Sequence, residues 1–264
     1  MPTPLSPEYR LTIQFSLGGL SFVLFNSASQ SVSDMEFHQS DSLNSSDELF
    51  RVLEKDLNAR DLGNLQSVDC MIDGRTHTLV PEALYQPDQK DRLLGFGLTV
   101  PNGYITSADP VTPLQAYNLY AYPEALRNRI LSKWPNARIL HSASVFLESL
   151  PKSDTPVVYV NVRNRDFDLA IMQDRLLFFN NFTFNTKVDF SYYLLFAMQQ
   201  HELSGLETPV CFTGLIQPSS EIIDLCRRYL KDIRFVSKPK GLNLKATLAE
   251  VPFQYYYNHY QILK

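Results

Sequence analysis

Apolar and polar residues alternate most regularly near the start of the chain. Apolar side chains occupy every second position of residues 11–15 and of residues 20–24, on either side of the turn Leu17-Gly18-Gly19. An alternation of period two, interrupted by glycines, predicts a strand, a tight turn and a second strand. Residues 35–38 are expected to add a third strand.

A helix is predicted after these strands. The capping box from Ser45 to Glu48 precedes a run of residues that places Leu49, Phe50, Leu53 and Leu57 on one side. The pattern from residue 67 to residue 105 is typical of strands separated by turns at Asp73-Gly74 and Asn102-Gly103. Further on, the sequence predicts a strand (116–122), a helix (123–133), a short strand (137–141) and a helix (144–150).

The first pattern recurs after the polar segment Pro151–Pro156, which is the best candidate for a linker. Moving the apolar positions of 11–15 and 20–24 forward by 147 places them on apolar residues of 158–162 and 167–171. The later segments are expected to form a strand (175–184), a helix capped by Asp189 (190–201), a strand (209–213), a helix (219–230) and a strand (233–236). Any two amphipathic hairpins can align in this way, but the matching order of elements favours a repeat.

Two copies of a β-β-β-α-β-α unit predict an α/β protein with two lobes and a cleft between them. We place the lobes at residues 1–152 and 153–264. The segment 251–264, rich in tyrosine, is expected to form a last helix that packs back on the first lobe. The alternative for this segment is a protein-binding surface.

Composition excludes several classes of protein. The 264 residues are 44% hydrophobic, so the chain can bury a large core, and the formal net charge of −4 gives no overall attraction to nucleic acid. Three cysteines without CxxC spacing are expected to be buried free thiols. With no signal peptide and no apolar run long enough to span a bilayer, we expect a cytoplasmic protein.

One stretch carries a family resemblance. In Pro209–Leu230 a strand leads through Thr213-Gly214 into a helix, and this stretch resembles the adenosine-binding turn of the actin-like ATPase superfamily. That superfamily includes actin, sugar kinases and the scaffolds of pilus and secretion assembly. The resemblance implies two actin-like (ribonuclease H-like) lobes with mixed central sheets, in a divergent, uncharacterised bacterial family. Leu215 and Ile216 stand where the family has further glycines.

The phosphate loops implied by the resemblance are degenerate. Residues 161–168 align with a loop like Asp-Ile-Gly-Gly-Gly-Thr-Thr-Asp, and they keep only the last aspartate. In the first loop a glutamine or a serine, depending on the register, stands where the family has an aspartate that helps to hold Mg²⁺. The nucleotide-binding positions carried over by the resemblance are Gln14, Ser16, Gly18, Gly19, Asn161, Arg163, Arg165, Asp168, Thr213 and Gly214.

Phosphoryl transfer needs backbone N–H groups close to phosphate oxygens and a metal that neutralises the developing charge. Side chains in place of glycines block that approach, and amides carry no charge for Mg²⁺. We therefore expect no ATP hydrolysis, no catalytic residue and no bound metal or cofactor, with ATP as the one ligand left open. Arg163 and Arg165 have two interpretations: they bind phosphate directly, or they pair with Asp166 and Asp168 in a solvated turn, which we prefer.

A basic cluster near the end of the chain also has two interpretations. It is either a dock for an acidic partner, for a phospholipid or for nucleic acid, or it is the solvated side of a helix. The net negative charge of the whole chain favours the second interpretation. The members of the cluster are Arg227, Arg228, Lys231, Arg234, Lys238 and Lys240. The five histidines show no metal-binding spacing.

We therefore expect a non-catalytic scaffold or regulatory protein, a pseudoenzyme that keeps the actin-like frame and binds a protein partner or a second copy of itself. The alternative is a nucleotide-binding ATPase or kinase with unusual phosphate loops. A thermal shift with Mg-ATP separates the two.

Overall fold

The chain divides into two compact units, which we describe separately. The structure is a computed structural model that describes residues 8–16, 19–40, 45–60, 62, 64–238, 242–244, 248 and 251–263. The first unit comprises Met1–Glu148, Lys240–Val251 and Asn258–Lys264, and the second comprises Ser149–Pro239 and Pro252–Tyr257.

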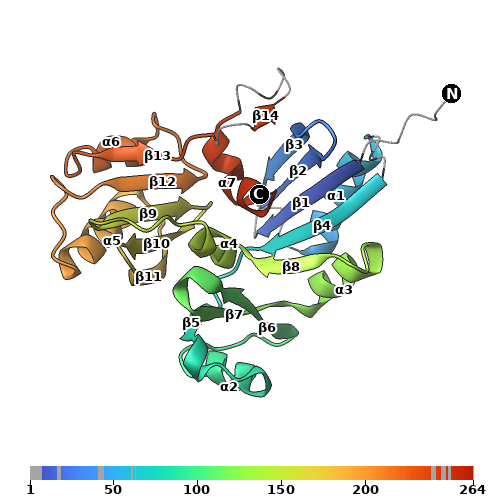
Figure 1. Ribbon diagram of the computed structural model, residues 1–264, viewed down its shortest axis with the longest axis horizontal. Helices are drawn as coiled ribbons and strands as arrows, with labels where there is room; N and C mark the ends of the chain where they lie inside the picture. Colours follow the sequence, from blue (N-terminus) through green and yellow to red (C-terminus); the bar gives the residue numbers. More distant parts are fainter. Residues whose placement is uncertain are drawn as a thin grey trace. The chain divides into compact units, whose positions relative to one another are not determined.

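The first unit contains a mixed six-stranded sheet in the order β14-β3-β2-β1-β4-β8 and a smaller antiparallel sheet in the order β5-β7-β6 (Figure 1). Its strands are β1 (Glu8–Ser16), β2 (Gly19–Asn26), β3 (Ser31–Gln39), β4 (Asn64–Ile72), β5 (His77–Pro81), β6 (Tyr104–Val111), β7 (Ala116–Pro123), β8 (Arg138–His141) and β14 (Asn243–Leu244). Its helices are α1 (Ser46–Asn58), η1 (Glu82–Leu84), η2 (Pro87–Gln89), α2 (Lys90–Gly95), η3 (Thr112–Leu114), α3 (Glu124–Lys133) and α4 (Ser142–Glu148). Helix α7 (Tyr257–Leu263) also belongs to the first unit, except for Tyr257.

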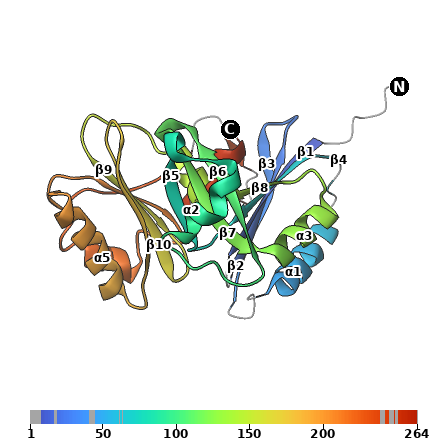
Figure 2. The same cartoon turned by 90° about the horizontal axis from the view of Figure 1, so that it is seen from below.

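The predicted first hairpin is confirmed. β1 and β2 are antiparallel, with Leu11 opposite Leu24 and Phe15 opposite Leu20, and these side chains are buried. Helices α1 and α3 cover this face of the sheet (Figure 2). The predicted capping of α1 is also present, because the Ser45 hydroxyl accepts the N–H of Glu48 at 3.3 Å.

Helix α7 covers the opposite face of the same sheet. The imidazole of His259 lies between two hydroxyls, with Nδ1 2.8 Å from Thr12 Oγ1 and Nε2 2.9 Å from Ser21 Oγ. Arg10 donates to the carbonyls of Leu263 and Ile262, which ends the helix with a cation. Burial removes the water that an imidazolium ion needs and lowers the pKa of His259 to about 3.

The prediction that residues 67–105 are strands separated by turns is wrong in its second half. After β5 the chain forms η1, η2 and α2 before β6 begins. α2 buries Leu94 against Val80 and Leu119 of the small sheet. A helix of only six residues shows too little periodicity to be distinguished from a loop in the sequence.

The second unit has a mixed five-stranded sheet in the order β11-β10-β9-β12-β13 (Figure 1). Its strands are β9 (Val157–Val162), β10 (Asp166–Met172), β11 (Leu176–Thr183), β12 (Val210–Gly214) and β13 (Ile233–Phe235). Its helices are α5 (Lys187–Gln200), α6 (Glu221–Cys226) and η5 (Phe253–Tyr256).

The hairpin β9–β10 has the same register as β1–β2 when its residues are shifted by 147. Val158 is opposite Ile171 and Val162 is opposite Phe167, as Leu11 is opposite Leu24 and Phe15 is opposite Leu20. The apolar face of β9 and β10 packs on α5 and α6.

Two details of these helices differ from the prediction. The N-cap of α5 is Thr186, and Asp189 completes a capping box from the third helical position. α6 begins at Glu221 and ends at Cys226, whereas a helix to residue 230 was expected. The residues that follow it form turns instead. In these turns the carbonyl oxygen of Tyr229 comes so close to Gly205 that a Cβ on Gly205 would lie 2.4 Å from it.

The three cysteines are free, as expected, and Cys211 is only half-buried. Within the described ranges, no helix is both long enough and apolar enough to cross a membrane.

Candidate functional site

The turn between β9 and β10 is closed by its own side chains. The guanidinium of Arg163 makes a bidentate contact with Asp168, with Nη1 to Oδ2 at 2.5 Å and Nη2 to Oδ1 at 2.9 Å. Its Nε donates to Asp166 Oδ1 at 2.5 Å, and Asn181 Nδ2 donates to Asp168 at 3.0 Å. The pairing that we preferred for Arg163 is therefore present.

The expectation that this turn is solvated is wrong for Arg163 and Asp168, whose side chains are 8% and 0% exposed. The side chain of Arg165 is exposed at the tip of the turn. The backbone N–H of Arg163 donates to the carbonyl of Asp166 at 2.8 Å, which makes an ordinary hairpin connection. Arg163 thus has its charge matched by two carboxylates of its own hairpin.

The turn after β12 keeps one glycine for a steric reason. Gly214 has φ +82°, and a Cβ there would lie 2.1 Å from the carbonyl oxygen of Val162 on the neighbouring strand. The N–H of Leu215 then donates to that same oxygen at 2.7 Å. Only glycine allows this approach. Leu215 is half-buried and Ile216 is buried, so the bulky residues in place of the family's glycines pack into the unit.

Helix η5 lies against the same turn. Thr213 Oγ1 donates to the carbonyl of Gln254 at 3.2 Å, and Gln254 Nε2 donates to the carbonyl of Ile216 at 3.0 Å. Asn161 is opposite Thr213 in the parallel pairing of β9 and β12. The Asn161 amide is buried, and its Nδ2 has no hydrogen-bond partner among the described residues.

The first unit places Gln14 beside a carboxylate that the sequence analysis missed. Gln14 Nε2 lies 2.9 and 3.1 Å from the two carboxylate oxygens of Asp73. Asp73 follows β4, which is parallel to β1, so the carboxyl ends of both strands meet at one edge. The sequence showed Asp73 only as a turn residue. Its place directly after a buried strand was the signal that could have found it.

The other described positions of the first loop contact each other within the β1–β2 hairpin. Ser16 Oγ donates to the carbonyl of Gly19 at 3.2 Å across the hairpin turn. Gly18 lies outside the described residues. The remaining positions from the resemblance belong to the second unit.

A buried polar network in the first unit was also missed. The carboxylate of Asp109 accepts the N–H of His141 at 2.7 Å, the hydroxyl of Ser144 at 2.7 Å and the hydroxyl of Tyr120 at 3.1 Å. Burial raises the pKa of Asp109 to about 6, although these hydrogen bonds oppose the shift. Ser144 donates to a carboxylate here, so this network has no serine–histidine pair of the hydrolase type.

The basic cluster is partly neutralised by neighbouring carboxylates. Arg227 pairs with Asp224 at 2.8 Å, and Arg234 makes a bidentate contact with Asp232. Arg228, Lys231 and Lys238 are exposed, and Lys240 lies outside the described residues. Exposed pairs of this kind support our preference for a solvated surface.

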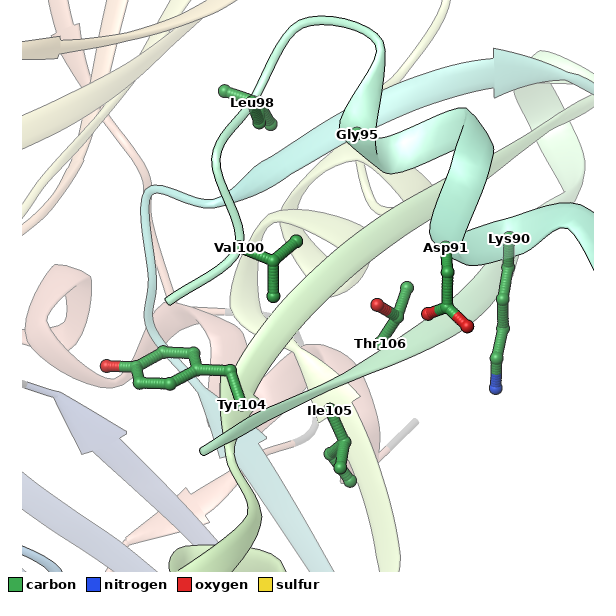
Figure 3. A pocket seen from close by; sticks show the side chains of 8 residues that line it. All are labelled: Lys90, Asp91, Gly95, Leu98, Val100, Tyr104, Ile105 and Thr106. Carbon is green, nitrogen blue, oxygen red and sulfur yellow. The ribbon is translucent and has the colours of Figure 1, made fainter. Parts of the chain in front are cut away.

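An open groove of about 660 Å³ lies between α2 and β6 (Figure 3). Asp91 points from α2 towards Thr106 on β6, while Val100 contributes an apolar wall. β6 is the last strand of its sheet, so the groove runs beside a sheet edge. The groove is lined by Lys90, Asp91, Gly95, Leu98, Val100, Tyr104, Ile105 and Thr106.

Metal ligands do not gather in the described part of the chain, where no group of three His, Cys, Asp or Glu residues could hold an ion. The candidate features among the described residues include the closed turns after β9 and β12 in the second unit, and the Gln14–Asp73 pair and the groove beside β6 in the first.

Comparison with solved structures shows the fold. A protein from Bacteroides thetaiotaomicron with an actin-like ATPase fold and unknown function matches with a TM-score of 0.77 and 18% identity, covering 89% of this chain and 93% of that one. The PilM–PilN complex of type IV pilus biogenesis matches with a TM-score of 0.63 and 11% identity, covering 96% of each chain. The cytoplasmic domain of EpsL, an inner-membrane component of the type II secretion system of Vibrio cholerae, matches with a TM-score of 0.50 and 10% identity, covering 97% of this chain and 94% of that one.

These similarities confirm the expected fold class, an α/β fold of two actin-like lobes with mixed sheets. A search of curated protein sequences gave no match. Residues 3–233 match the family model described as "Protein of unknown function (DUF3822)", and the chain therefore belongs to that family.

Proposed function

We propose that the protein is a non-catalytic scaffold that keeps the actin-like frame and binds a segment of a protein partner. The observation that carries the proposal is the closed turn at Arg163. A phosphate loop needs bare backbone, but here a buried guanidinium and two carboxylates fill the turn. Phosphate would have to displace an ion pair that is already desolvated and matched.

The turn after β12 supports the same proposal. Gln254 of η5 bonds to both sides of the Thr213–Ile216 turn, so the chain itself occupies the backbone that the resemblance assigns to adenosine. Displacing η5 would cost these hydrogen bonds, each worth about 1 kcal/mol.

The groove beside β6 is the surface that we assign to the partner. An edge strand next to an open groove suits an extended peptide, which can add to the sheet edge and place one side chain in the groove. The similarity to PilM, a protein that forms a complex with PilN, gives independent support.

The second candidate, nucleotide binding, is favoured by one observation. Asp73 places a carboxylate beside Gln14, which is one of the two positions, Gln14 or Ser16, where the resemblance puts the aspartate that helps to hold Mg²⁺. A thermal shift decides between the two. A nucleotide site with a dissociation constant of about 10 µM would stabilise the protein by about 3.7 kcal/mol in about 5 mM Mg-ATP.

We expect no shift and no phosphate release with Mg-ATP. A shift that disappears in Asp73→Asn would establish the second candidate instead. For the scaffold itself, peptides selected from a displayed random library should bind the wild type and fail to bind Thr106→Arg, which fills the groove. Asn128→Arg, an exposed position on α3, is the matched control and should bind as the wild type does.

A further inference from the structure

The outer edge of β6 carries backbone groups that are directed away from its sheet. β6 is the last strand of the small sheet and is antiparallel to β7. The N–H of Glu124 donates to the carbonyl of Gly103 at 2.9 Å, so the odd-numbered residues on this side bond to β7. The even-numbered residues Thr106 and Ala108 therefore direct their N–H and C=O groups outward.

The pairing of β7 on its other side gives the same result. The N–H of Ala121 donates to the carbonyl of Thr76, just before β5, at 2.8 Å. Odd-numbered residues of β7 therefore bond towards β5 and even-numbered ones towards β6. Among the described residues, none makes a hydrogen bond with the outward groups of Thr106 and Ala108. A row of such groups is what an added strand binds.

The open part of this edge is short. At its start the N–H of Tyr104 donates to the carbonyl of Pro101 at 3.2 Å, and at its end Pro110 has no N–H to offer. The N–H groups of Thr106 and Ala108 lie between these two ends. A strand that adds here therefore pairs over about five residues.

The groove lies on one side of this edge. Side chains along a strand alternate between the two faces of its sheet. Tyr104 and Ala108 pack against the cluster that contains Leu94 of α2, so the even-numbered residues of β6 face the groove (Figure 3). The residues of an added strand that lie opposite Tyr104, Thr106 and Ala108 direct their side chains to the same face.

The two ends of the groove differ in chemistry. Asp91 is exposed and points towards Thr106 (Figure 3). No described residue, its neighbour Lys90 included, forms an ion pair with Asp91. At the other end, Val100 lies beside Tyr104 and offers an apolar wall (Figure 3). The groove thus asks for a cation opposite Thr106 and for an apolar group opposite Tyr104.

We propose that the partner segment runs antiparallel to β6 and contains a lysine or arginine two residues before a large apolar residue, which we call the groove motif. The basic side chain lies opposite Thr106 and pairs with Asp91, and the apolar side chain lies opposite Tyr104 against Val100. The antiparallel direction continues the pairing of the small sheet, in which both pairs of strands are antiparallel. The groove motif rests on the function proposed above, since it describes the partner of the same groove.

A second copy of this chain does not fit this edge. β6 contains no lysine or arginine, so the β6 strand of another copy would bring no cation to Asp91. Pairing the two edges would instead bring the Asp91 carboxylates of both copies to one junction, where they repel. Charge therefore favours an unrelated protein segment that carries the groove motif.

Selection of peptides from the displayed random library, with the full chain as bait, tests the proposal. The wild type should enrich a basic residue two positions before an apolar one. Asp91→Lys should enrich an acidic residue in place of the basic one and keep the apolar one. Asp88→Lys makes the same charge change at an exposed position of η2 that does not line the groove, and it should select as the wild type does. Unchanged circular dichroism and melting temperature show that each variant folds.

Fluorescence anisotropy of the most enriched peptide, synthesised with a fluorophore, tests the register. Replacing its basic residue by glutamate should weaken binding to the wild type about tenfold and strengthen binding to Asp91→Lys. Methylating the backbone nitrogen of the basic residue, which pairs with Thr106, should also weaken binding about tenfold. Methylating the nitrogen of the next residue should leave the affinity unchanged, because that N–H points away from β6.

The outcomes separate this inference from the proposed function. Peptides that bind the wild type, fail to bind Thr106→Arg and lack the basic residue overturn the inference alone. Peptides with the apolar residue before the basic one, or with the methylation pattern reversed, do the same, because the strand then runs parallel. A wild type that enriches no peptide overturns the proposed function and the inference together, as does a wild-type dimer that Thr106→Arg abolishes.

Discussion

His259 gives the sharpest test of how the first unit is held together. The imidazole bridges Thr12 and Ser21 in its neutral form, and its pKa in the folded protein is about 3, against 6.5 in the unfolded chain. Because the folded pKa is the lower one, the fold binds fewer protons than the unfolded chain between these values. The stability that His259 contributes is complete above pH 6.5 and is lost as the pH falls towards 3.

The magnitude follows from the two pKa values. Each pKa unit corresponds to about 1.4 kcal/mol, so His259 should lower the free energy of unfolding by about 2 kcal/mol between about pH 7.5 and about pH 5. Asp109 acts in the opposite sense, because its folded pKa of about 6 lies above its unfolded value of 3.8. It should raise the free energy of unfolding by about 1 kcal/mol over the same range. The wild type should therefore lose only about 1 kcal/mol on acidification.

The assay is urea unfolding at these two pH values in the wild type and in His259→Gln, whose amide can still bond to both hydroxyls without titrating. Trp134, the single tryptophan, packs against the core of the first unit and reports its unfolding by fluorescence. The two proteins should differ in their pH response by about 2 kcal/mol, and His259→Gln should become more stable at the lower pH. His201→Gln in the second unit is the matched control. An equal pH response of the wild type and His259→Gln would refute the reasoning.

Three further outcomes follow from the second unit and the buried network, each measured by urea unfolding. Gly214→Ala should cost at least about 3 kcal/mol, because its Cβ would overlap the Val162 carbonyl in a left-handed backbone; a loss below about 1 kcal/mol would show that the turn can relax. Arg163→Ala should cost about 3–5 kcal/mol by leaving the buried Asp168 without its counterion, whereas Arg163→Met combined with Asp168→Asn should recover most of it; equal losses would contradict the role of the pair. Asp109→Asn should remove the rise of about 1 kcal/mol in the free energy of unfolding that Asp109 contributes between about pH 7.5 and about pH 5, because an amide does not titrate; an unchanged pH response would contradict this.

The sequence predicted the elements whose pattern is long and regular. The two hairpins and helices α1 and α5 could be read from alternation or capping, because each has one face that must be apolar. The small sheet of the first unit was only partly predicted. Its α2, η1 and η2 are short, and their conformation depends on packing against β7.

The candidate site shows the same limit. The pairing of Arg163 with Asp166 and Asp168 follows from their spacing on one hairpin. The burial of these residues does not follow from that spacing, because Asn181, which completes the cluster, comes from the separate strand β11. Asp73 beside Gln14 depends on β1 and β4 being parallel neighbours, which no local pattern shows.

The buried pair of Arg163 and Asp168 has a consequence for the natural variation of this family. Replacing Arg163 alone leaves the buried carboxylate of Asp168 without its counterion, and replacing Asp168 alone leaves the buried guanidinium of Arg163 with Asp166 as its remaining partner. An evolving lineage therefore passes through a less stable intermediate unless both codons change nearly together. Relatives should therefore inherit the two residues as a unit or lack both. Gly214 should persist alongside them, while the exposed tip at Arg165 should vary from one relative to the next.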